Sequence, residues 1–187
     1  GLRPGTYTVV QAQPAAFFAG GVTAGSVGGT TGVNQISEIE LGSGVDATDY
    51  DFCEEPPASL SGSVHIDADG DCVRDPDEQG IEGVTIELRD AAGNRVATTT
   101  TDSQGHYQFV GLRGGQDNVF EVQPEGYFQG GQVLGSAGGV VLGVDLMSVS
   151  LEPGQTAVDY LFCEYEPGSI SGSVWSDADQ AQQRAAD

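Results

Sequence analysis

The sequence contains no lysine, and its six arginines face 28 acidic residues, which gives a formal net charge of −22 at pH 7. So negative a field disfavours nucleic acid and anionic membrane surfaces as partners, and it favours cations. No run approaches the roughly 18 continuous apolar residues of a membrane span, and no charged segment followed by an apolar one opens the chain. We therefore expect no nucleic-acid binding and no membrane insertion by this chain. Any export signal is expected to have been removed or to lie outside these residues.

Apolar residues are also scarce, at 38% of the chain, whereas glycine is abundant, with 29 residues. The Val, Ile, Leu, Phe and Tyr residues fall in short alternating runs, a pattern typical of strands with one buried face. The many glycines indicate frequent turns. The composition thus predicts small β domains with modest cores.

The chain repeats itself at an offset of 110 residues, so that Gly1 aligns with Gly111. Further matched pairs are Leu2 and Leu112, Phe18 and Phe128, Tyr50 and Tyr160, Cys53 and Cys163, Gly62 and Gly172, and Asp67 and Asp177. A gap-free self-match of this length indicates a tandem array of domains. We predict one complete unit at residues 59–168, the C-terminal part of a preceding unit at 1–58, and the N-terminal strand of a following unit at 169–187.

Seven strands are predicted in the complete unit, each rich in β-forming residues and bounded by Gly, Asp, Asn or Pro. Their ranges are 59–66, 83–90, 94–101, 106–110, 118–124, 145–151 and 156–163. Seven short strands indicate an all-β fold of sandwich type. The predicted core consists of Leu60, Val64, Val84, Ile86, Leu88, Val96, Tyr107, Phe109, Leu151, Tyr160 and Phe162. The glycine-rich run 129–143 and its twin 19–32 are expected to be long exposed loops.

The segment DADGDCVRDPDE carries the chemistry of the chain, because it places acidic residues at positions 1, 3, 5, 9 and 12 of a calcium loop. These residues are Asp67, Asp69, Asp71, Asp75 and Glu78, and the backbone carbonyl of Val73 would serve at position 7. Ca²⁺ binds about six to eight oxygens, which such a loop supplies. The sequence therefore predicts a Ca²⁺ site here.

The loop departs from a helical EF-hand, because Cys72 stands at position 6 where a glycine is expected, and Gly70 lies at position 4. The following GIEGVTIELRD alternates as a strand does, so we expect the loop to join strands and to turn in a different way. A solvated acidic turn is the simpler alternative. Carboxylates so spaced would, however, repel one another at a few ångströms without an ion.

The stretch GSVHIDADGDCVRDPDEQGIEGVTIELRDAAGNRVATTTTDSQGHYQFVGL resembles the SdrD B-like domain, a relative of the collagen-adhesin B-type repeats of bacterial surface proteins. The later YFQGGQVLGSAGG and DYLFCE segments share the resemblance. It implies tandem Ig-like or prealbumin-like β-sandwich domains, calcium in the acidic loop, and a rigid stalk module outside the cell. Its ion ligands would be the five acidic residues of the loop. Asp102, in TDSQG, is a further candidate ligand, although Asp before a turn is more often turn chemistry.

Two departures from the family pattern matter. Many B-type relatives contain a lysine–asparagine isopeptide bond, which a chain without lysine cannot form. The third unit begins its acidic loop with Asp177 and Asp179, but Gln180, Ala181, Gln182 and Ala185 replace Gly70, Asp71, Cys72 and Asp75. That loop is not expected to hold an ion.

The cysteines predict a covalent staple. Strands 59–66 and 156–163 should be parallel neighbours, so Cys72 and Cys163 would meet at the pole where both strands end. A disulfide between them would close a loop of 163 − 72 = 91 residues. The partner of Cys53 by the same logic would precede residue 1, so Cys53 is expected to be unpaired or intermolecular. Three buried, reduced cysteines are the alternative.

These features favour a structural repeat of an extracellular or cell-surface fibre, stalk or adhesin, made rigid by calcium and a disulfide, with copies of the same repeat as head-to-tail partners. One alternative is strand addition, in which residues 168–176 of one protomer pair with the half-domain 1–53 of the next. Another is an adhesin module that grips a glycan or host protein through exposed aromatics such as Phe17, Phe18, Tyr127 and Phe128.

An enzyme finds little support in the sequence. His65 and His106 lie on presumed strands, and His65 aligns with Trp175 in the next unit, which does not suit a catalytic base. Paired carboxylates are also typical of hydrolases, but a metal loop explains those of this chain better.

Overall fold

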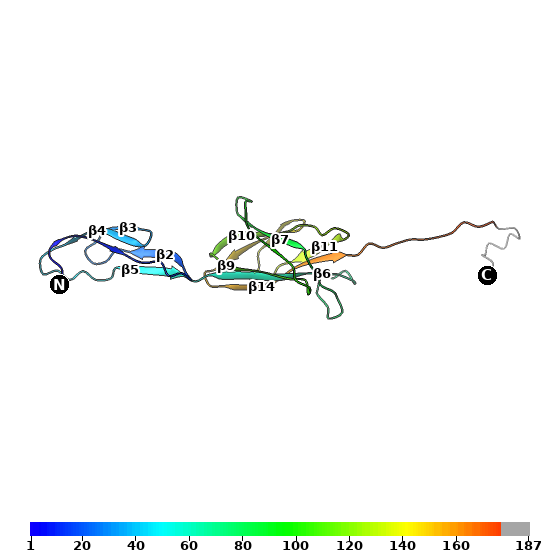
Figure 1. Ribbon diagram of the computed structural model, residues 1–187, viewed down its shortest axis with the longest axis horizontal. Helices are drawn as coiled ribbons and strands as arrows, with labels where there is room; N and C mark the ends of the chain where they lie inside the picture. Colours follow the sequence, from blue (N-terminus) through cyan, green and yellow to red (C-terminus); the bar gives the residue numbers. More distant parts are fainter. Residues whose placement is uncertain (177–187) are drawn as a thin grey trace.

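A computed structural model describes residues 1–176 of the chain. These residues form strands, turns and extended segments, and none of them lies in a helix long and apolar enough to cross a membrane. Figure 1 shows two β units that follow one another along the long axis, after which the chain runs on as an extended segment. The all-β fold predicted from composition and alternation is confirmed.

The complete unit is a sandwich of two sheets. Its strands are β6 (Ala58–Ile66), β7 (Thr85–Asp90), β8 (Arg95–Thr100), β9 (His106–Leu112), β10 (Gly115–Glu121), β11 (Phe128–Val133), β12 (Val140–Gly143), β13 (Leu146–Leu151) and β14 (Thr156–Tyr165). One sheet has the order β11-β14-β6-β9 and the other β12-β13-β10-β7-β8. As predicted, β6 and β14 are parallel neighbours, with Ser59 opposite Thr156 and Ile66 opposite Glu164.

The core lies between the two sheets and contains the predicted residues with one exception. Tyr160, Phe162, Leu60 and Val64 are fully buried, whereas Val96 is 56% exposed. The prediction for Val96 was wrong because the alternation of β8 has the opposite phase. Ala97 lies opposite Leu88 and packs against the core, so its neighbour Val96 points outward.

The glycine-rich run 129–143 is not a long loop, which corrects the prediction. It contains β12 and most of β11, and these strands pair with β13 and β14 at the edges of the two sheets. Glycine serves close approach here, because a Cβ on Gly130 would lie 2.8 Å from the Cys163 carbonyl oxygen. The twin run in the first unit likewise contains most of β2 (Phe18–Thr23) and all of β3 (Thr30–Gly32).

The first unit is a half-sandwich. It adds β1 (Gly5–Val10), β4 (Gln35–Leu41) and β5 (Asp51–Glu55), which form sheets β1-β4-β3 and β2-β5. These sheets match β10-β13-β12 and β11-β14 of the complete unit, but residues 1–57 hold no counterpart of β6 to β9. Val9 is consequently 41% exposed, whereas its match, Val119, is fully buried.

The segment after β14 forms no strand within residues 166–176, although a strand was predicted from residue 169. Its twin in the complete unit, β6, is held between β14 and β9, and no strand of the described residues pairs with 166–176. A single strand without a neighbour leaves its backbone groups to water and gains no ladder. The predicted loss of calcium ligands after Asp177 and Asp179 lies outside the described residues.

Candidate metal centre

The acidic loop leaves β6 and returns beside it. The Ile66 amide donates to the Gln79 carbonyl at 2.9 Å, and Gly80 forms a bridge with His65. This return requires glycine, because a Cβ on Gly80 would lie 2.0 Å from the Gln104 carbonyl oxygen. The two ends of the loop are thus fixed to the same strand, as the strand-joining loop of the sequence prediction requires.

Three of the predicted ligands converge at the start of the loop. Carboxylate oxygens of Asp67, Asp69 and Asp71 lie within 4.8 Å of one another. Asp67 is buried, and its two oxygens accept hydrogen bonds from the amides of Gly70, at 2.8 Å, and Cys72, at 3.1 Å. The charge of Asp71 is the main cause that raises the pKa of Asp69 above its usual value. The three acids therefore repel one another in the absence of a cation.

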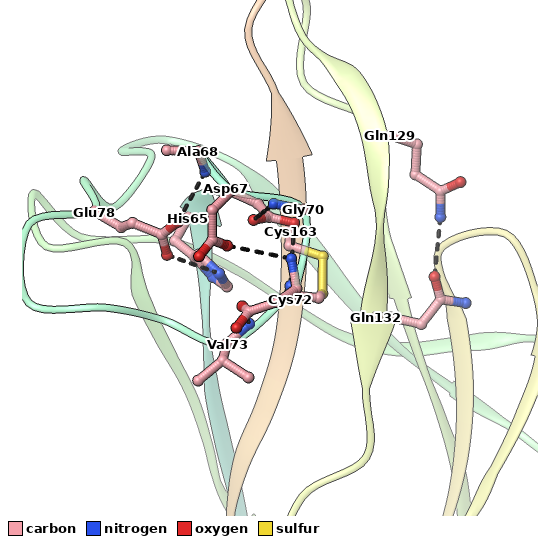
Figure 2. The surroundings of a disulfide bond; sticks show 12 residues. His65, Asp67, Ala68, Gly70, Cys72, Val73, Glu78, Gln129, Gln132 and Cys163 are labelled. Atoms are coloured by element: carbon pink, nitrogen blue, oxygen red, sulfur yellow. Dashed lines mark hydrogen bonds and ion pairs between the residues drawn. A yellow bond between two sulfur atoms is a disulfide. The ribbon is translucent and has the colours of Figure 1, made fainter.

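Glu78 closes the loop, and Figure 2 shows its side chain directed back toward Ala68 and His65. One oxygen accepts from the Ala68 amide at 2.8 Å and the other from the Asp75 amide at 3.1 Å. His65 Nε2 lies 3.6 Å from Glu78 Oε2. Burial, which outweighs the charge of Glu78, lowers the pKa of His65 below its usual value, so its ring is neutral at neutral pH. The histidine is a buried neighbour of the loop.

The remaining candidates are placed less centrally. The carboxylate of Asp75 is exposed, and the Val73 amide donates to Asp71 Oδ1 at 2.7 Å. Asp102 does not join the acidic loop. Its carboxylate accepts from the amides of Gln104 and His106, both at 2.9 Å, and these backbone hydrogen bonds lower its pKa. Of the two interpretations of Asp102, the structure supports turn chemistry.

The turn is made by two left-handed residues. Gly70 has φ 87° and Cys72 has φ 55°, so Cys72 itself adopts the conformation that position 6 normally assigns to glycine. A non-glycine residue in this region is disfavoured unless its surroundings hold it. The side chain of Cys72 is held by a covalent bond.

That bond is the predicted disulfide between Cys72 and Cys163, with the two Cα atoms 5.5 Å apart (Figure 2). It ties the acidic loop to the last strand of the unit. The neighbouring backbone does the same, because the Asp67 amide donates to the Glu164 carbonyl at 2.9 Å. Within the described residues, Cys53 is exposed and forms no disulfide.

The donor set fits a hard divalent cation. The converging groups are carboxylate oxygens, which Ca²⁺ prefers, and each oxygen that accepts an amide hydrogen keeps a second lone pair. Asp67, Asp69 and Asp71 would provide ligands from the first half of the loop. Glu78, at the end of the loop, is held in place by hydrogen bonds from the Ala68 and Asp75 amides. A bound cation would remove the mutual repulsion of these carboxylates.

Sequence reasoning missed a second acidic cluster, in which Glu121, Asp145 and Glu164 meet within 4.8 Å and are all buried. Strand alternation could have found two of these residues. Glu121 is in phase with the core residue Val119, and Glu164 is in phase with Phe162, so both point between the sheets.

Comparison with known proteins supports the resemblance seen in the sequence. Residues 58–141 match the model of the SdrD B-like domain. Serine-aspartate repeat-containing protein F of Staphylococcus epidermidis is 33% identical over 127 residues, which cover 68% of this chain and 7% of that protein. Serine-aspartate repeat-containing protein I of Staphylococcus saprophyticus is 46% identical over 81 residues, or 43% of this chain and 4% of that protein. The chain thus spans only a small part of these relatives.

A fibrinogen-binding protein of Staphylococcus epidermidis is 41% identical over 81 residues, which cover 43% of this chain and 7% of that protein. Among solved structures, a minor pilin of Streptococcus agalactiae has a TM-score of 0.41 at 16% identity and covers 74% of this chain and 61% of the pilin. The Bacillus anthracis TIE protein has a TM-score of 0.48 at 14% identity and covers 87% of this chain and 34% of that protein. On this sequence match, residues 58–141 form an SdrD B-like domain.

Proposed function

We propose that the chain is a repeat segment of an extracellular bacterial stalk or surface adhesin, and that calcium in the loop 67–78 makes each unit rigid at its exit. The observation that carries this proposal is the convergence of Asp67, Asp69 and Asp71 in a loop that a disulfide joins to the last strand, β14. An ion bound there would fix the loop, and the loop is tied to the residues through which the chain leaves the domain. The repeats and the surface-protein relatives support a structural role and not catalysis.

The junction between the two units supports a stalk with a defined geometry. The Arg113 guanidinium donates to the Ala19 carbonyl at 2.6 Å and lies 3.2 Å from Glu55 Oε2. Its carbon Cζ lies 5.8 Å from the centre of the Phe18 ring. One arginine of the complete unit therefore contacts three residues of the preceding unit, which restricts rotation about the linker of Pro56 and Pro57.

Replacing Asp69 and Asp71 by asparagine is expected to weaken calcium binding at the loop by about tenfold or more, because ligand charge sets the affinity of such loops. Isothermal titration of the full chain with calcium measures this effect. Asp77→Asn is the matched control, because Asp77 lies in the same loop, is exposed and occupies no ligand position. Equal affinity in the Asp69/Asp71 variant and the wild type would remove the loop from consideration as a calcium site.

Calcium is also expected to protect the exit of the unit. At about 100 times the dissociation constant, linkage stabilises the bound state by about 2.7 kcal/mol, so amide exchange through local opening should slow by up to about 100-fold. The effect should cover residues 67–78 and the end of β14, because Asp67 bonds to Glu164. Hydrogen–deuterium exchange with and without chelator measures it. Protection confined to the loop would argue against rigidification of the exit.

A second candidate function is an adhesin module, which the exposure of aromatic side chains favours. Phe17 is 46% exposed and Phe128 is 64% exposed, and they lie on the two units. One relative is named a fibrinogen-binding protein. Binding of the chain to immobilised fibrinogen tests this function, and loss of binding in Phe17→Ser/Phe128→Ser would support it. No binding by the wild type would leave the stalk as the better account.

A further inference from the structure

A second group of carboxylates lies inside the complete unit, at the same pole as the acidic loop but between the two sheets. Glu121 ends β10, Asp145 forms the turn between β12 and β13, and Glu164 is the penultimate residue of β14. The Glu121 amide donates to the Asp145 carbonyl at 3.0 Å, which fixes two of the three segments to each other. The third segment is held by the Asp67 contact to the Glu164 carbonyl.

These carboxylates are buried without the partners that buried charges require. Glu121 and Glu164 are 0% exposed, and Asp145 is 5% exposed. Both oxygens of Glu121, one of Asp145 and one of Glu164 have no hydrogen-bond partner among the described residues. Glu164 Oε2 accepts a hydrogen bond from the side-chain amide of Gln123, and a hydrogen bond from the Gln129 side chain partly offsets the effect of burial on the pKa of Asp145. Buried polar groups in native proteins are almost always paired, so four unpaired oxygens in one place require an explanation.

In the preceding unit, amide side chains supply hydrogen bonds at the matched position. Gln11 and Glu54 stand where the complete unit has Glu121 and Glu164. Asn34 matches Asp145, because each is left-handed, with φ 57° and 56°, and the Asn34 carbonyl accepts from the Gln11 amide at 2.9 Å. The offset is therefore 145 − 34 = 111 at this turn, one more than the gap-free 110 of the sequence alignment.

Amides replace two of the three acids in that unit and donate hydrogen bonds to the third. The Gln11 side chain donates to Glu54 Oε1 at 2.5 Å, and the Gln13 side chain donates to Glu54 Oε2. Asn34 donates to Gln13 Oε1 at 2.9 Å. At these positions of the preceding unit one buried oxygen, Gln11 Oε1, has no hydrogen-bond partner, whereas the cluster of Glu121, Asp145 and Glu164 has four such oxygens. The complete unit has thus exchanged hydrogen-bond donors for negative charge at matched positions.

We propose that Glu121, Asp145 and Glu164 bind a second divalent cation, of the size and hardness of Ca²⁺, inside the complete unit. Their oxygens lie within 4.8 Å of one another, and two ligands on opposite sides of a Ca²⁺ ion are separated by about 5 Å. Three carboxylates offer up to six oxygens, which reaches the lower end of the coordination that Ca²⁺ uses. The cation would supply positive charge in place of the amide hydrogens that Gln11 and Asn34 offer in the preceding unit, whereas Gln123 matches Gln13 and donates to Glu164 as Gln13 donates to Glu54.

The electrostatics agree with this assignment. Burial, followed by the charges of Glu164 and Asp145, raises the pKa of Glu121 to about 9. Burial likewise raises the pKa of Glu164 to about 7 and that of Asp145 above its usual value. The cluster therefore resists ionisation unless a positive charge is present, and a dication is the partner that lets all three groups ionise together.

The test compares two double variants of the full chain after removal of metal. Glu121→Gln/Asp145→Asn copies the amides of the preceding unit, and Asp69→Asn/Asp71→Asn disables the loop. Native mass spectrometry and calcium titration should show that each double variant binds one calcium ion per chain fewer than the wild type. The Glu121/Asp145 variant should keep the fold, because its amides can donate to Glu164 as Gln11 donates to Glu54.

Thermal unfolding gives a second readout. The calcium-dependent rise in melting temperature should be smaller in Glu121→Gln/Asp145→Asn than in the wild type, whereas its melting temperature without calcium should equal or exceed that of the wild type. If this variant binds as many calcium ions as the wild type, the cluster holds protons and the inference fails. Loss of an ion in this variant, with none lost in the loop variant, would support the internal site and refute the proposed loop function.

Discussion

Replacement of both Cys72 and Cys163 by alanine is expected to lower the free energy of unfolding of the complete unit by about 4 to 5 kcal/mol, because the bridge closes a loop of 91 residues. The bond restricts the unfolded chain, and this restriction disappears when it is removed. The native state also loses the support for Cys72, whose left-handed backbone is disfavoured for an alanine. Urea denaturation monitored by far-UV circular dichroism measures the change.

The matched control is Cys53→Ala. Cys53 occupies the same repeat position as Cys163 but is exposed and forms no disulfide within the described residues. It should change stability by no more than about 0.5 kcal/mol, as exposed substitutions usually do. A double variant as stable as the wild type would show that packing of β14, and not the covalent bond, holds the loop to the exit.

Gly62→Ala is expected to destabilise the complete unit by about 3 kcal/mol or more, because it inserts a methyl group into a space occupied by backbone. Gly62 lies in β6, opposite Tyr160 of the parallel strand β14. A Cβ there would lie 1.7 Å from the Tyr160 carbonyl oxygen and 2.7 Å from the Tyr107 hydroxyl. That hydroxyl donates to the same carbonyl at 2.9 Å, so the two central strands must separate and a buried hydrogen bond is lost.

Gly143→Ala serves as the control for the glycine substitution. Gly143 also lies in a strand, β12, but a Cβ there would meet no atom within 4 Å and its φ is not left-handed. Its effect on the melting temperature should be small, whereas Gly62→Ala should lower the melting temperature strongly or abolish cooperative unfolding. Similar melting temperatures for the two variants would mean that β6 and β14 can separate at little cost.

The strands of the complete unit were predictable where alternation and turn residues are both present. The parallel pairing of β6 and β14 followed from the ends of the repeat, and the disulfide followed from that pairing. The edge strands β11 and β12 were not predictable in the same way, because their glycines remove the hydrophobic alternation that marks a strand. These strands form because they pair with β14 and β13, and their glycines allow close contact, as Gly130 does with Cys163.

The two acidic clusters differ in how visible they are to sequence reasoning. The loop ligands Asp67, Asp69 and Asp71 are close in sequence, so their spacing alone indicates a shared site. Glu121, Asp145 and Glu164 are brought together only by the sandwich, because they belong to three separate segments. Alternation could place Glu121 and Glu164 inside the domain, but it could not bring Asp145 to them. The match between Asn34 and Asp145, at an offset of 111, could likewise be recognised only from their backbone conformations.

The parallel arrangement of β6 and β14 determines how a pulled stalk would respond. Tension enters the domain at Ala58, where β6 begins, and leaves at Tyr165, where β14 ends, at the opposite pole. The hydrogen bonds between these strands are then loaded together in shear and do not open one by one. If these hydrogen bonds break, the Cys72–Cys163 bond still prevents the loop of 91 residues that it closes from extending, which is roughly 300 Å of fully stretched chain. Each disulfide-closed unit would therefore act as a nearly inextensible link.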